Sequence, residues 1–174
     1  MGENWPDKEG REELEINEFI KHYKKLPNGK VLEIIDKCPN GNSGPDYVVR
    51  DTITEVFFGI ELTSVYLNDR SVPDIHKKPL NGLVSIPYDK EQIEKYKTRL
   101  LQAIKDKIKK AYQYDKSYPL ILSVYVNEYV SIHMDREDFE SLVRANEGLF
   151  DRMWPFSEIV FWPLPNGGVF SVKP

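Results

Sequence analysis

Apolar side chains recur along the chain with two spacings, one typical of helices and one typical of strands. Helical spacing covers residues 11–26, where a Pro-Asn-Gly cluster ends it, and a longer stretch from Asp89 to about Tyr114. Asp89 is predicted to be the N-cap of this second helix. A third helix is predicted over residues 134–150. The pattern therefore predicts helices near the start, in the middle and in the last third of the chain.

Short apolar runs bounded by turn residues predict strands between these helices. The runs cover residues 31–36, 46–49, 54–65, 119–126, 158–162 and 168–172. The run at 119–126 is apolar on both faces, as in a central strand, and the last two runs flank a turn, as in a hairpin. The elements together predict an α/β fold that ends in a helix and a β-hairpin.

One acidic residue interrupts the predicted strand 54–65. Successive side chains of a strand alternate between its faces, so Glu61 shares one face with Gly59 and Thr63, while Ile60 and Leu62 lie on the other. Both faces are otherwise largely apolar. Burying a carboxylate in such a strand costs folding free energy unless the carboxylate is paired or binds a cation. The small Gly59 leaves space on the same face where another group or a ligand can approach.

Acidic residues also accompany the first predicted helix. Its apolar stripe consists of Ile16, Phe19, Ile20 and Tyr23. Glu12 is predicted to lie along this stripe one turn earlier, whereas Glu15 and Glu18 are predicted to point away. The alternative is that glutamates in a first turn only complement the helix dipole.

The second predicted helix is rich in lysine. Its basic residues outnumber its acids by eight to two between residues 95 and 116: Lys95, Lys97, Arg99, Lys105, Lys107, Lys109, Lys110 and Lys116 against Asp106 and Asp115. Lys107 falls three residues after Ile104 and four before Ala111, at the edge of the apolar stripe. From there its side chain can be aimed at the sheet. The alternative is a solvated helix face on which Lys107 extends toward water.

Composition limits the classes of protein. A chain of 174 residues with 40% hydrophobic residues is expected to form a single domain over residues 1–174. The net charge of -4 argues against coating nucleic acid or membrane by charge alone, so any nucleic-acid site is local. The single Cys38 excludes an internal disulfide, and no apolar run approaches the roughly 18 residues of a membrane span. The expected location is therefore cytoplasmic.

A long polar segment follows the strand 54–65. Residues 66–88 exceed the usual length of a structureless connection, so the segment is predicted to be a functional flap or to contain a short element. His76 in this segment can reach a site, although loop histidines are more often solvated.

The order of the first six elements, with two short motifs, resembles the core of the PD-(D/E)XK, or restriction-endonuclease-like, nuclease superfamily. The motifs are Pro45-Asp46 at the start of the second strand and Glu61-Leu62-Thr63 in the third, with fourteen residues between the two acids. The resemblance covers roughly residues 12–126. It implies an αβββαβ core with a mixed sheet and a nuclease activity that depends on Mg²⁺ or Mn²⁺.

The resemblance also implies roles for individual residues. Asp46 and Glu61 match the metal-binding acids, and the backbone carbonyl of Leu62 is expected to add a third oxygen ligand, which suits a hard cation. The family pattern has a lysine where this chain has Thr63. In some members the following helix supplies that lysine, and Lys107 is the candidate here.

The same scheme assigns the acid of the first helix to Glu12. Two functions fit these assignments: a metal-dependent nuclease acting on DNA or RNA, and a catalytically inactive module of the same fold that binds nucleic acid or protein. An accidental match is the third interpretation, and it predicts that Asp46 and Glu61 lie far apart.

Overall fold

The computed structural model describes residues 7–38, 43–67, 87–115, 117–126 and 129–174. Its centre is a six-stranded sheet in which the strands lie side by side in chain order. The strands are β1 (Leu32–Lys37), β2 (Tyr47–Asp51), β3 (Phe57–Val65), β4 (Leu120–Val126), β5 (Phe156–Leu164) and β6 (Gly168–Val172). The pairs β3–β4 and β4–β5 are parallel and the other neighbours are antiparallel, so the predicted mixed sheet and C-terminal hairpin are confirmed.

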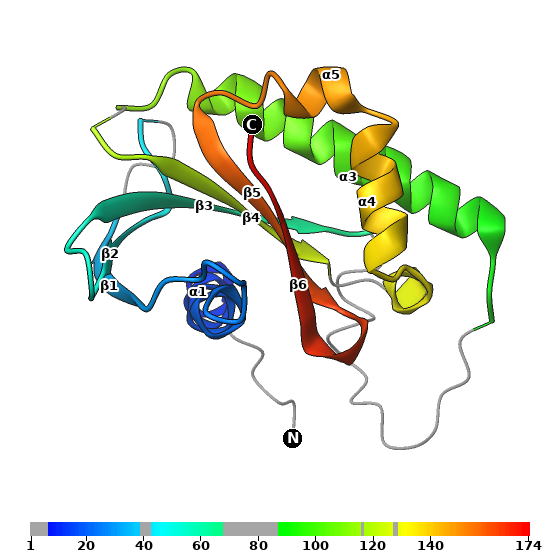
Figure 1. The fold of residues 1–174 in the computed structure, drawn as a ribbon, viewed down its shortest axis with the longest axis horizontal. Coiled ribbons are helices and arrows are strands. Elements are labelled where there is room, and N and C mark those ends of the chain that lie inside the picture. Colours follow the sequence, from blue (N-terminus) through cyan, green and yellow to red (C-terminus); the bar gives the residue numbers. More distant parts are fainter. Residues whose placement is uncertain (1–6, 39–42, 68–86, 116, 127–128) are drawn as a thin grey trace.

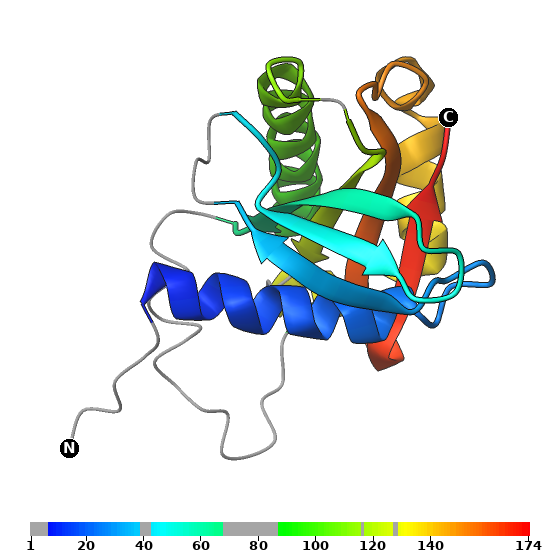
Figure 2. The same cartoon turned by 90° about the vertical axis from the view of Figure 1, so that its left-hand side faces the viewer.

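Helices cover both faces of the sheet (Figures 1 and 2). The helical elements are α1 (Lys8–Tyr23), α3 (Lys90–Ala111), η1 (Tyr129–His133), α4 (Arg136–Arg144), α5 (Glu147–Phe150) and η2 (Pro165–Gly167). One apolar core lies between the sheet and α1, and a second lies between the sheet and α3 with α4. The predicted order of helix, three strands, helix and strand is confirmed.

Strand β3 contributes to both cores, as its alternation predicts. Phe58, Ile60 and Leu62 pack in the core beneath α1, and Val65 packs in the core beneath α3. None of the helices in the described ranges is long and apolar enough to cross a membrane.

The prediction of one continuous helix over residues 134–150 is wrong. α4 ends at Arg144, and the side-chain amide of Asn146 donates to the backbone oxygen of Leu142 at 2.8 Å. This bond satisfies a carbonyl of the last turn and separates α4 from α5. The α4 N-cap is Asp135, whose carboxylate forms a capping box with the first turn.

The predicted flap between β3 and α3 lies largely outside the described residues, as does His76. Asp89 is the N-cap of α3, and its carboxylate accepts a hydrogen bond from Gln92 N at 3.1 Å. The start of this helix is therefore confirmed to within one residue.

The lengths of β2 and β3 differ in a way that positions the candidate site. β2 pairs with β3 only from Tyr47 opposite Ile60 to Arg50 opposite Phe57, whereas β4 pairs with β3 as far as Val65. Among the described residues, no strand pairs with β3 on the β2 side beyond Ile60. We call residues 61–65 on this side the open edge of β3.

Pro45 fills the space beside Gly59. A methyl group added at Gly59 would lie 2.6 Å from Leu120 Cδ2 and 2.8 Å from Pro45 Cγ. The space that was predicted beside Gly59 is therefore filled by Pro45, the residue before Asp46.

We expect Gly59→Ala to lower the free energy of unfolding by about 1–3 kcal/mol, because the rigid proline ring must move to admit the methyl group. Gly44→Ala is the matched control, since nothing lies within 4 Å of a methyl group there. Urea denaturation of both variants measures the effect. Equal stability of Gly59→Ala and the wild type would contradict the tight packing of Pro45 on β3.

Candidate functional site

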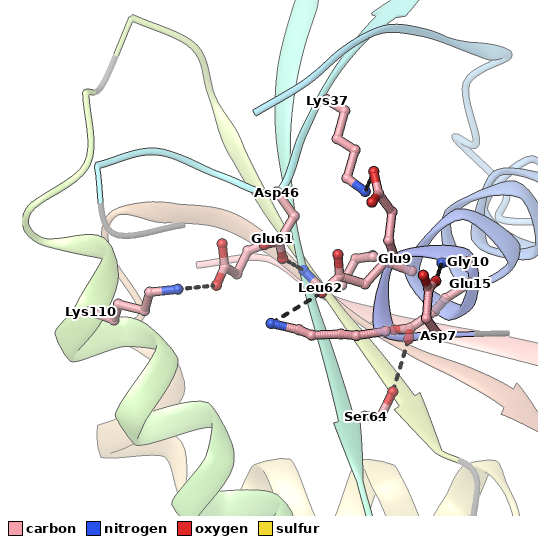
Figure 3. A network of polar contacts seen from close by, with 12 residues as sticks. Asp7, Glu9, Gly10, Glu15, Lys37, Asp46, Glu61, Leu62, Ser64 and Lys110 are labelled. Carbon is pink, nitrogen blue, oxygen red and sulfur yellow. Dashed lines mark hydrogen bonds and ion pairs between the residues drawn. The ribbon is translucent and has the colours of Figure 1, made fainter. Parts of the chain in front are cut away.

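Asp46 attaches the start of β2 to the open edge of β3. Its Oδ2 atom accepts a hydrogen bond of 2.7 Å from the backbone N–H of Leu62. Asp46 comes immediately before β2, so its side chain continues the pairing between the two strands by one step. The carboxylate lies beside the peptide group that joins Glu61 to Leu62 (Figure 3).

Glu61 lies on the opposite face of β3 from α1 and has no exposed surface. Its Oε1 atom accepts hydrogen bonds from Lys107 Nζ at 2.6 Å and from Lys110 Nζ at 3.3 Å. A buried carboxylate loses its hydration, and the two ammonium groups compensate for that loss. Both lysines come from α3, and Lys110 points toward Glu61 in Figure 3.

Lys107 makes a second contact at the same place. Its Nζ atom donates to the backbone oxygen of Leu62 at 2.8 Å. One ammonium group therefore bridges the Glu61 side chain and the carbonyl of the next residue. Lys107 reaches this position because it flanks the buried stripe of α3, where Ile104 and Ile108 face the sheet.

Lys110 was not predicted to belong to the site. It stands three residues after Lys107, a spacing that puts both lysines on one flank of a helix. This spacing is the signal that could have identified it.

Beside Lys107 and Lys110, the buried Glu61 Oε2 and Tyr114 Oη atoms have no hydrogen-bond partner among the described residues. Burial raises the pKa of Tyr114 well above its usual range, and the negative charge of Glu61 raises it further. The hydroxyl of Tyr114 therefore lies close to the Glu61 carboxylate.

Glu15 is the acid of α1 that enters the site. Its Oε2 atom accepts a hydrogen bond of 2.9 Å from Ser64 Oγ on the open edge of β3, and its buried Oε1 atom has no hydrogen-bond partner within the described residues. Burial raises the pKa of Glu15 to about 7, and the nearby negative charge of Asp46 adds to this rise. The Ser64 hydrogen bond and the positive charge of Lys107 lower the pKa in part.

The prediction that Glu15 points away from the core is wrong. The buried side of α1 consists of Ile16, Phe19 and Tyr23, whereas Ile20 is only half-buried. At about 100° per residue, Glu15 lies about 40° around the helix axis from the buried Phe19, so it flanks the buried face of the helix. Glu15 was therefore predicted to point in the wrong direction.

Glu12 and Thr63 stand at the margin of the site. Glu12 is half-buried, and its ion pair is with Lys8 Nζ at 3.6 Å. Its negative charge contributes to the raised pKa of Glu15. Thr63 is half-buried and lies opposite Val124 of β4, so a positive charge in the site comes from α3 rather than from β3.

The oxygen atoms of the site suit a hard cation in their chemistry. Asp46, Glu61 and the Leu62 carbonyl supply carboxylate and carbonyl oxygens, which Mg²⁺ and Mn²⁺ prefer. The buried, unpartnered Oε2 atom of Glu61 is an acceptor that a cation could use. Within the described residues, no three side chains of Asp, Glu, His or Cys gather closely enough to hold a metal ion.

The fold and these side chains define an α/β protein with a buried acid paired to lysine at the open edge of a central strand. No protein-family model and no curated protein matches the chain. Among solved structures, the chain is similar to the structure of Pyrococcus furiosus SfsA in complex with Ca²⁺, with 13% sequence identity and a TM-score of 0.36. The similarity covers 93% of this chain and 63% of SfsA, so the chain spans less than two thirds of that protein's length.

The raised pKa of Glu15 predicts a dependence of stability on pH. The folded protein holds the Glu15 proton up to about pH 7, whereas the unfolded chain releases it near 4.5. This contribution to stability is present below pH 4.5 and is lost as the pH rises to about 7. We therefore expect Glu15→Gln, which stays neutral, to exceed the wild type by roughly 1–3 kcal/mol at pH 8 and to match it near pH 4.5.

Urea denaturation at pH 4.5, 6 and 8 measures this difference, with Glu18→Gln as the control. Glu18 is exposed on the same helix, and its hydrogen bond with Lys21 lowers its pKa, so its variant lacks the gain at high pH. A Glu15→Gln difference that does not change with pH would show that the pKa of Glu15 is the same in the folded protein as in the unfolded chain.

Proposed function

We propose that the protein is a metal-dependent nuclease that hydrolyses phosphodiester bonds of DNA or RNA. The observation that carries the proposal is the position of Lys107 Nζ, 2.6 Å from Glu61 Oε1 and 2.8 Å from the carbonyl oxygen of Leu62. It gives the site a positive charge beside its acids although Thr63 stands at the motif position of lysine. Asp46 is held on the same stretch of backbone by its hydrogen bond to Leu62 N.

The element order supports membership of the PD-(D/E)XK superfamily. Residues 8–126 follow the order αβββαβ, and the two motif acids flank a single peptide group at the open edge of β3. The hydrogen bond from Lys107 to Glu61 supports the proposal that the helix after β3 supplies the lysine that Thr63 replaces.

The chain's residues take separate parts in this proposal. Asp46, Glu61 and the Leu62 carbonyl would hold Mg²⁺ or Mn²⁺, and the bound ion would lower the pKa of a coordinated water and offset negative charge on the phosphodiester. During hydrolysis a water oxygen loses a proton and bonds to phosphorus, the bond to the leaving oxygen breaks, and that oxygen takes up a proton from solvent. Lys107 donates to the oxygen on which negative charge grows. Glu15, with a pKa of about 7, accepts a proton near neutral pH, in place of Glu12.

A specific observation favours a second candidate, the inactive nucleic-acid-binding or protein-binding module. Asp46 and Lys107 already satisfy the backbone N–H and carbonyl of Leu62, which an open strand edge would otherwise leave unpaired. In this alternative both residues only complete the sheet. The same experiment separates the two candidates.

We expect the protein to cleave single-stranded or double-stranded DNA or RNA when Mn²⁺ or Mg²⁺ is present and to leave each substrate intact with EDTA. Asp46→Asn, Glu61→Gln and Lys107→Met should each lower the rate by about 100-fold or more, because each removes a charge that acts on the phosphodiester. Gel-based cleavage assays on the four substrates measure this. Asp151→Asn and Lys24→Met remove the same kinds of charge from exposed positions and should retain the wild-type rate.

Cleavage that persists in an Asp46→Ala, Glu61→Ala double variant would rule out this site. An absence of metal binding together with an absence of cleavage would favour the inactive module. Circular dichroism of every variant verifies that it is folded before its rate is compared.

A further inference from the structure

Lys107 occupies the oxygens that the proposed function assigns to a cation. Its ammonium group lies within hydrogen-bond distance of Glu61 Oε1 and of the Leu62 carbonyl oxygen. These are two of the three groups expected to hold Mg²⁺ or Mn²⁺. The third, Asp46, bonds the N–H of the same residue, Leu62.

An ammonium group and a divalent cation make similar demands on a site. Each is a compact positive charge that draws in carboxylate and carbonyl oxygens, the ammonium at about 2.8 Å and the metal at about 2.1 Å. Two cations bound to the same two oxygens repel each other strongly, because the buried site screens them poorly. Only one of them can be held fully by this pair of oxygens.

The free protein already holds positive charge at this point. Lys107 and Lys110 bring two ammonium groups to the Glu61 carboxylate, and Asp46 is bonded to the N–H of the next residue, Leu62. A divalent cation added to all four side chains would leave an excess of positive charge in a partly buried site. That excess disappears when an ammonium group withdraws from Glu61 or when a phosphodiester binds at the same time.

We infer that Lys107 is a built-in competitor for the divalent cation: it holds Glu61 Oε1 and the Leu62 carbonyl until the cation displaces it. This inference rests on the proposed function, because it concerns the same site. Its consequence is weak metal binding in the absence of substrate. A displaced Lys107 is free to bond a phosphate oxygen, so cation and phosphodiester strengthen each other's binding.

Lys110 provides a graded comparison. It contacts the same Glu61 oxygen at 3.3 Å, whereas the Leu62 carbonyl is bonded by Lys107, and its ammonium lies 5.6 Å from the centre of the Tyr114 ring. Its removal therefore frees less of the cation's ligand set than the removal of Lys107.

The test is a titration of the protein with Mn²⁺ alone, followed by calorimetry and by the electron paramagnetic resonance signal of unbound Mn²⁺. We expect Lys107→Met to bind Mn²⁺ roughly tenfold more tightly than the wild type, because this variant lacks the ammonium group that competes for the same oxygens. Lys110→Met should bind it only a few times more tightly. Lys24→Met should match the wild type, and Glu61→Gln should lose binding.

Thermal unfolding gives a second readout, which can be used even when Lys107→Met is folded but less stable than the wild type. Loss of Lys107 leaves the buried Glu61 charge under-compensated, so this variant should melt below the wild type in EDTA. Added Mn²⁺ should raise its melting temperature by more than it raises that of the wild type, because the metal replaces the lost positive charge and binds the folded state.

The outcomes distinguish this inference from the proposed function. Mn²⁺ binding that depends on Asp46 and Glu61 but is equal or weaker in Lys107→Met would overturn the competition and leave the metal site standing. An absence of Mn²⁺ binding in the wild type and in every variant would overturn both. Tighter binding in Lys107→Met supports the inference, and a larger shift of its melting temperature by Mn²⁺ supports it independently.

Discussion

Glu61 places a carboxylate with no exposed surface inside the central sheet. A charge in such a position persists only when an opposite charge and hydrogen bonds accompany it, and removing one partner of a buried pair costs about 3–5 kcal/mol. Lys107 provides both the charge and the hydrogen bond. The pair therefore links α3 to β3 across the core between them, and Lys110 contacts the same Glu61 oxygen from the next turn of the helix.

The open edge of β3 explains why these side chains meet. β2 ends its pairing at Ile60, so the backbone groups of Leu62 need other partners. Asp46 supplies the acceptor and Lys107 supplies the donor, from elements that precede and follow β3 in the chain. Glu15 reaches the same edge from α1 through Ser64. Side chains from both faces of the sheet thus meet where β3 extends beyond its pairing with β2.

Much of this arrangement could be predicted from the sequence because it follows from periodicity. The order of elements, the burial of both faces of β3 and the orientation of Lys107 toward the sheet all depend on spacings of two or 3.6 residues. Glu15 could not be placed in this way. Its position depends on how α1 is rotated over the sheet, because a residue at the flank of the buried stripe can point toward the sheet or away from it. The division of the last helix depended on a side-chain bond from Asn146, which no periodicity reveals.

The open edge also bears on how copies of this protein behave toward one another. Unpaired backbone groups on a sheet edge are a template for an additional strand, and natural proteins protect such edges with charged side chains. At Leu62 the N–H is bonded to the carboxylate of Asp46 and the carbonyl to the ammonium group of Lys107. A strand from another molecule would have to break both bonds and leave two charges without their partners. Asp46 and Lys107 therefore also protect this edge against aggregation by strand addition.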